Sequence, residues 1–74
     1  MNRLPTLRPK KIIAALKKAG FEEHHQRGSH LYLWQPLTRR MTSVAIHPGD
    51  VPRPVFKKIL EQADLTEDKF RELL

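Results

Sequence analysis

The sequence contains no cysteine, and this absence excludes disulfide bonds and thiolate metal ligands. It also lacks any apolar run of about 18 residues, the length that a membrane-spanning helix needs. The first residues do not have the apolar core of a secretory signal peptide. We therefore expect a cytoplasmic protein that does not contact membranes, and the length of 74 residues predicts a single domain over residues 1–74.

Acidic residues are scarce in the first half of the chain. Residues 1–40 contain nine Lys or Arg and two Glu, a net charge of +7, whereas residues 41–74 contain five Lys or Arg and six Asp or Glu, a net charge of −1. A concentrated positive charge is typical of proteins that bind a polyanion such as RNA, although an acidic protein partner would fit the same charge.

Hydrophobic periodicity predicts an α+β fold. The expected elements are a helix that starts at Thr6–Pro9 and stops at Gly20, strands at 21–26, 29–34 and 41–47, a helix from Pro52–Pro54 to Ala63, and a short C-terminal helix capped by Thr66 and anchored by Phe70, Leu73 and Leu74. The first strand is polar at its centre, which indicates an edge strand. Both long helices have one apolar face, which we expect to pack on one face of the three-stranded antiparallel sheet. This is the double-stranded-RNA-binding-domain type of arrangement, with the other sheet face open.

One motif stands out in this layout, the segment Gln26–Tyr32 with the sequence QRGSHLY. Together with the later VAIHPG over Val44–Gly49 and the helix over Val55–Ala63, it resembles the HicA family, small toxins of bacterial and archaeal toxin–antitoxin pairs that are described as messenger-RNA interferases. The resemblance runs from about Lys10 to Leu65. Two segments depart from the family pattern: residues 22–25 are more polar, and residues 64–74 extend past the shortest members, where we expect them to add packing and not chemistry.

The resemblance implies a double-stranded-RNA-binding-like fold and cleavage of messenger RNA without a metal or other cofactor. It also implies a HicB-like antitoxin that covers the active surface. The catalytic histidine of the family lies in its Gly-Ser-His motif and corresponds to His30.

A histidine suits this chemistry because imidazole exchanges protons near neutral pH and RNA carries its own nucleophile, the 2′-hydroxyl. We interpret His30 as the general base that leaves a cyclic phosphate. Arg27 is the nearest cation, Ser29 precedes His30, and His47 should lie near it because the start of one strand and the end of the next are neighbours in an antiparallel pair.

Other cations and one aromatic residue are candidates for holding RNA. They are Lys10, Lys11, Arg27, Arg39, Arg40, Lys57, Lys58 and Tyr32. For each lysine, a solvated helix face is the alternative. Tyr32 and Trp34 fall on the same side of the strand as His30, where stacking on RNA bases, core packing and an antitoxin interface all remain open.

Several alternatives compete with the nuclease interpretation. A non-catalytic RNA-binding module would share the fold and the charge, and a protein dedicated to one acidic partner would share the charge. No metal site is predicted, because a zinc site made of His24, His25, His30 and His47 would be an unusual set of four imidazoles. A protease or a small-molecule enzyme is disfavoured, since there is no cysteine nucleophile and no credible serine triad.

Overall fold

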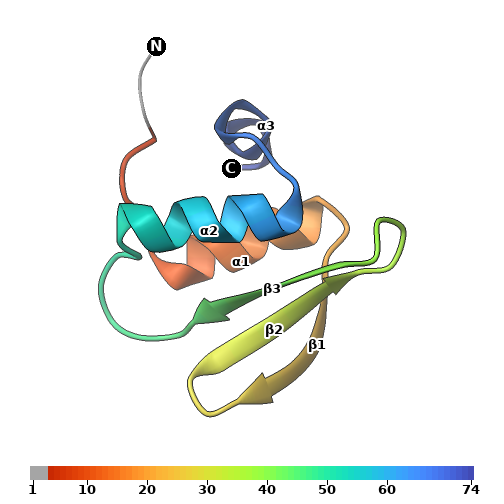
Figure 1. Cartoon of the computed structure of the whole chain (residues 1–74). Coiled ribbons are helices and arrows are strands. Elements are labelled where there is room, and N and C mark those ends of the chain that lie inside the picture. The colour runs from red at the N-terminus through yellow and green to blue at the C-terminus, as the bar shows by residue number, and fades with distance from the viewer. Residues whose placement is uncertain (1–3) are drawn as a thin grey trace.

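The computed structural model describes residues 4–74. Its elements, in chain order, are α1 (Pro9–Lys18), β1 (Glu22–Arg27), β2 (His30–Gln35), β3 (Arg40–Ala45), α2 (Arg53–Ala63) and α3 (Glu67–Leu73). The strands form one antiparallel sheet in the order β1-β2-β3, and the helices lie on one side of it (Figure 1). The predicted α+β order of elements is confirmed. Within residues 4–74, none of the helices combines the length and the hydrophobicity that a membrane span requires.

The core lies between the sheet and the helices. Alternate residues of β2 and β3 are buried, which is the pattern of a sheet covered on one face. The predicted apolar faces of both long helices are confirmed. The core side chains from these elements are Leu31, Leu33, Thr42 and Val44 of the sheet, Ile12, Ala15 and Leu16 of α1, and Phe56, Ile59, Leu60 and Ala63 of α2. In the last helix Phe70 is fully buried, but Leu74, which was also expected in the core, is 47% exposed.

The third strand ends earlier than the sequence predicts. Its regular pairing with β2 stops at Ala45 instead of continuing to His47. One further hydrogen bond, from the Ile46 amide to the Ser29 carbonyl (2.6 Å), precedes a break at Pro48. Proline has no amide hydrogen to continue a ladder. Ile46 therefore lies beyond the strand and is 44% exposed, not buried as its alternation predicts.

A β-bulge interrupts the pairing of β1, an edge strand whose six residues are all exposed. Before the bulge, Glu23 lies opposite Leu33. After it, His25 lies opposite Tyr32, so that His24 is the extra residue. Because side chains alternate along a strand, the extra residue moves every later side chain of β1 to the other face of the sheet.

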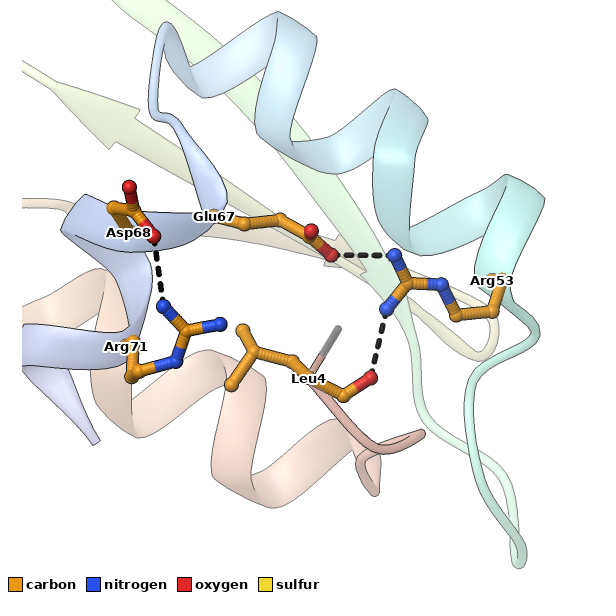
Figure 2. A network of polar contacts seen from close by, with 5 residues as sticks. All are labelled: Leu4, Arg53, Glu67, Asp68 and Arg71. Atoms are coloured by element: carbon orange, nitrogen blue, oxygen red, sulfur yellow. Dashed lines mark hydrogen bonds and ion pairs between the residues drawn. The ribbon is translucent and has the colours of Figure 1, made fainter. Parts of the chain in front are cut away.

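Arg53, the first residue of α2, holds three parts of the chain together (Figure 2). Its guanidinium donates to the carbonyl oxygen of Leu4 (2.8 Å) and to the carboxylate of Glu67 (2.5 Å). The same group lies over the ring of Phe56, 5.9 Å from its centroid. The side chains of Arg53 and Glu67 are only 22% and 31% exposed. One guanidinium therefore links the N-terminal segment, α2 and α3.

Replacing Arg53 by alanine should lower the free energy of unfolding by about 2 kcal/mol, because a partly buried carboxylate and a carbonyl lose a charged donor. Arg53→Lys should recover only part of the loss, since a lysine cannot reproduce the planar fork that serves two acceptors. Arg40→Ala is the matched control: it removes an exposed ion pair with Asp64 (3.9 Å). That change should stay within about 0.5 kcal/mol. Urea unfolding measures all three variants, and equal losses for Arg53→Ala and Arg40→Ala would contradict the role of Arg53.

Candidate active site

The helices lie on one face of the sheet (Figure 1). The other face carries three rows of side chains across the strands. Strand pairing gives the rows Arg27–His30–Ala45, His25–Tyr32–Ser43 and Glu22–Trp34–Met41. We call these nine residues the open face. A cation, two imidazoles and two aromatic rings gather here. This combination suits an RNA strand, because cations contact its phosphates and aromatic rings stack on its bases.

A two-residue turn sets the position of His30. Arg27 and His30 form the last pair of the hairpin, so Gly28 and Ser29 alone connect β1 to β2. Gly28 has a φ of 59°, and Ser29 is not among the residues with positive φ. This combination is that of a type II′ turn, which requires glycine at its first central position. His30 therefore begins β2 with an exposed side chain directly across from Arg27.

Tyr32, in the row next to His30, is the first of three rings that contact one another in series. The rings of His25 and Tyr32 are stacked, with their centroids 4.4 Å apart and their planes 8° apart. His24 meets His25 edge-on, and the Nδ1 atoms of the two imidazoles lie 2.7 Å apart, which is a hydrogen-bond distance. Both histidines are exposed and Tyr32 is half-buried. The stack is therefore a fixed arrangement of rings that solvent or a ligand can reach.

His47 lies in a different setting from His30. It follows β3, where its Nδ1 is 3.0 Å from the carbonyl oxygen of Pro48. Its side chain lines a surface groove of about 530 Å³ on the helix side of the sheet, and His30 is not among the residues that line it. Among residues 4–74 no contact joins the two imidazoles, and no group of three or more His, Asp or Glu side chains is arranged to hold a metal ion.

The groove itself has an apolar floor and a basic rim. Leu31, Pro9 and Ile13 contribute apolar surface, and Arg8, Lys10 and Lys17 contribute cations. Two of these cations are neutralised locally. Lys17 pairs with Glu23 at 2.5 Å, and Arg8 lies 3.9 Å from the Asp50 carboxylate.

The candidate RNA-binding residues divide between two sides of the protein. Arg27 and Tyr32 lie on the open face with His30. Four exposed lysines lie on helices that cover the other face of the sheet, namely Lys10 and Lys11 on α1 and Lys57 and Lys58 on α2. Arg39, with a φ of 60°, and Arg40 lie at the β2–β3 turn, and Arg40 pairs with Asp64. The structure thus brings together Arg27, His30 and Tyr32, and places the other cations outside the open face.

Residues 9–65 of the chain match a family model for the HicA toxin of bacterial toxin-antitoxin systems. This range contains α1, the whole sheet and α2, and therefore every residue of the open face. The chain belongs to the HicA toxin family. Membership of a toxin–antitoxin family implies that the protein has an antitoxin partner. No curated protein matches the chain.

The place of His25 on the open face was not predicted from the sequence, where His25 enters only as part of a disfavoured set of four imidazoles. Four consecutive polar residues show no alternation from which a strand register can be read. The bulge at His24 becomes visible only in the pairing of β1 with β2. The sequence does carry one signal. Two adjacent histidines lie in a strand that a tight turn joins to the strand of the motif histidine.

Proposed function

We propose that this toxin is a messenger-RNA interferase, an endonuclease that cleaves RNA without a metal and uses His30 as its general base. The observation that carries the proposal is the direct cross-strand pair of Arg27 and His30 on the open face of a HicA-family chain. Both side chains are exposed. An extended polymer such as RNA can therefore reach them without entering a buried cavity.

In the proposed reaction the neutral imidazole of His30 takes the proton of a 2′-hydroxyl, and the resulting oxygen attacks the adjacent phosphorus. The bond between phosphorus and the 5′-oxygen breaks, and the 5′-oxygen takes up a proton. The products are a 2′,3′-cyclic phosphate and a 5′-hydroxyl. Arg27, which lies opposite His30, supplies a cation for the charge that develops on the phosphate oxygens. Ser29 lies between these two residues in the turn and is a supporting candidate. His47, which lines the groove on the helix side, would have to support the reaction from outside the open face.

The remaining open-face residues would hold the strand. The stacked rings of Tyr32 and His25 would offer a base a surface on which to stack, and such stacking tolerates any base. The lysines on α1 and α2 and the arginines of the β2–β3 turn would contact the sugar–phosphate backbone outside the reacting centre, where contacts position RNA without reading its sequence.

We also propose that a HicB-like antitoxin covers the open face. Trp34 and Met41 share one row of this face, and Met41 is 36% exposed although it is apolar. Aromatic residues and methionine are enriched in protein interfaces. An antitoxin placed on this row would also block access of RNA to His30, two rows away.

The experiment that tests the function uses purified protein and an end-labelled messenger RNA in EDTA. Cleavage that leaves 2′,3′-cyclic phosphate and 5′-hydroxyl ends is expected, and the cognate antitoxin should stop it. A 5′-phosphate and a 3′-hydroxyl would exclude His30 as the base. Binding of RNA without cleavage, together with normal growth of cells that express the protein, would instead establish the alternative of a non-catalytic RNA-binding module.

Binding of RNA should weaken steeply with salt if the cations contact phosphates. With about four phosphate contacts, the Kd for a non-cleavable 2′-O-methyl RNA should rise roughly 10- to 100-fold between 50 and 200 mM salt, because bound counterions are released on binding. Fluorescence anisotropy at several salt concentrations measures the slope. Arg27→Ala should reduce that slope by about 0.7, the contribution of one phosphate contact to a single strand. A Kd that does not change with salt would show that the basic surface serves another partner.

A further inference from the structure

The open face holds a second exposed imidazole on the same side of the sheet as His30. Arg27 pairs with His30, and His25 pairs with Tyr32 in the adjacent row. His25 and His30 are therefore diagonal neighbours on one face of an antiparallel pair. The backbone positions of such neighbours lie roughly 7 Å apart, and this spacing admits one phosphate group between the two imidazoles.

This placement depends on the bulge at His24. In a regular strand His25 would share the face of Glu23, whose carboxylate pairs with Lys17 of α1 on the helix side. With the extra residue inserted, His25 points to the open face instead. Bulges next to active sites commonly redirect one side chain in this way.

The ring of His25 is fixed in a defined orientation. It is stacked on Tyr32, and its Nδ1 is hydrogen-bonded to Nδ1 of His24 at 2.7 Å. Within residues 4–74, Nε2 of His25 makes no hydrogen bond, so it is the ring nitrogen left for a ligand. When Nδ1 of His25 carries the hydrogen of this bond, Nε2 can bind or release a proton without breaking the contact with His24.

We propose that His25 is the general acid of the cleavage reaction, which rests on the proposed nuclease function with His30 as base. In this step His30 receives the proton of the 2′-hydroxyl, the 2′-oxygen bonds to phosphorus, and the bond from phosphorus to the 5′-oxygen breaks. The electron pair of that bond stays on the 5′-oxygen, which takes the proton from Nε2 of His25. His25 ends the step neutral and His30 ends it protonated, and exchange with water restores both. His24 acts as a positioning residue for His25.

The first test separates the acid from the base by changing the leaving group. Two RNAs of one sequence are compared at a single cleavage site, one with the natural 5′-oxygen and one with sulfur at that position, since a thiolate leaves without protonation. His25→Phe keeps a ring for the stack on Tyr32 but removes the proton. It should slow cleavage of the oxygen substrate about 10²- to 10⁴-fold and leave the sulfur substrate within about threefold of wild type. His25→Gln should have the same effects. His24→Ala should also slow cleavage of the oxygen substrate more than that of the sulfur substrate, but by a smaller factor.

The second test uses the pH dependence of the single-turnover rate. A base that must be neutral gives a limb that rises with pH, and an acid that must be protonated gives a limb that falls with pH. The pH–rate profile of His25→Phe should lose the falling limb and keep the rising one. Wild type acting on the sulfur substrate should give the same profile as His25→Phe. The titratable and charged groups next to His25 are His24 and, on the open face, Glu22 and Arg27 on β1 and Tyr32 and His30 on β2. They are unchanged in this comparison.

The control is Glu61→Gln, an exposed change on α2, which should match wild type on both substrates. Equal losses on both substrates for His25→Phe, or none, would overturn the role of His25 while leaving a nuclease that depends on His30. A wild-type protein that cleaves neither substrate would overturn the nuclease function and this inference together. The Kd of each variant for an RNA that lacks the 2′-hydroxyl at the cleavage site should stay close to that of wild type, since His25 is assigned to proton transfer and not to binding.

Discussion

Replacing His30 by alanine should lower the rate constant of RNA cleavage by about 10²- to 10⁴-fold, the usual effect of removing a general base. The fold should not change, because His30 is exposed and its strand partners are Arg27 and Ala45. A surface change of this kind alters the free energy of unfolding by no more than about 0.5 kcal/mol. Loss of activity can therefore be assigned to chemistry and not to unfolding.

Induced expression gives the corresponding test in cells. Wild-type protein should stop growth and fragment messenger RNA, and His30→Ala should do neither although it accumulates to the same level. Thr38→Ala, an exposed change in the β2–β3 turn, is the control and should remain toxic. Equal toxicity of wild type and His30→Ala would remove His30 from the chemistry and move attention to His47 and the basic groove.

Replacing Phe70 by alanine should lower the free energy of unfolding by about 3–5 kcal/mol. Phe70 is completely buried, and its ring meets that of Phe56 edge-on with the centroids 5.1 Å apart. A domain of 74 residues has a total stability of roughly 4–11 kcal/mol, so this one change should unfold much of the protein. The helix that carries Phe70 lies after residue 65, where the match to the family ends.

Urea denaturation measures this effect through the midpoint of the transition. Leu74→Ala is the matched control on the same segment, because Leu74 is 47% exposed and its truncation should cost little. A chain shortened after Leu65 should be at least as unstable as Phe70→Ala, because it also loses the Glu67 carboxylate that pairs with Arg53. A folded and toxic shortened chain would show that α3 is dispensable for both packing and activity.

The sequence specifies those parts of the fold in which a side-chain pattern repeats. The apolar positions of α1 and α2 recur at helical spacing, and Leu31 and Leu33 alternate with polar or aromatic neighbours, so the faces that are buried could be predicted. Thr66 was predicted to begin α3, and its hydroxyl accepts the hydrogen bond of the Lys69 amide at 3.1 Å. Each of these features is encoded within a few residues of where it appears.

The composition of the open face could be predicted only in part, because it depends on pairing between strands. The tight turn at Gly28 predicts that Arg27 and His30 are close, and the structure places them opposite each other. The side on which His25 lies depends on a single extra residue, for which a run of polar residues carries no signal. The position of His47 depends on where β3 stops. The alternation of side chains continues to His47 in the sequence, so it predicts an end two residues beyond the observed one at Ala45.

The bulged edge strand also bears on how the protein behaves at high concentration. A straight, apolar edge strand offers unpaired backbone groups to strands of other molecules, and it promotes aggregation. β1 instead presents charges at Glu22, Glu23 and Arg27 and a kink at His24, all of them exposed. Substitutions that made this strand regular and apolar would be expected to cause precipitation, even where they left the core and the rows of the open face intact. The polar sequence of β1 thus protects this edge of the sheet from self-association.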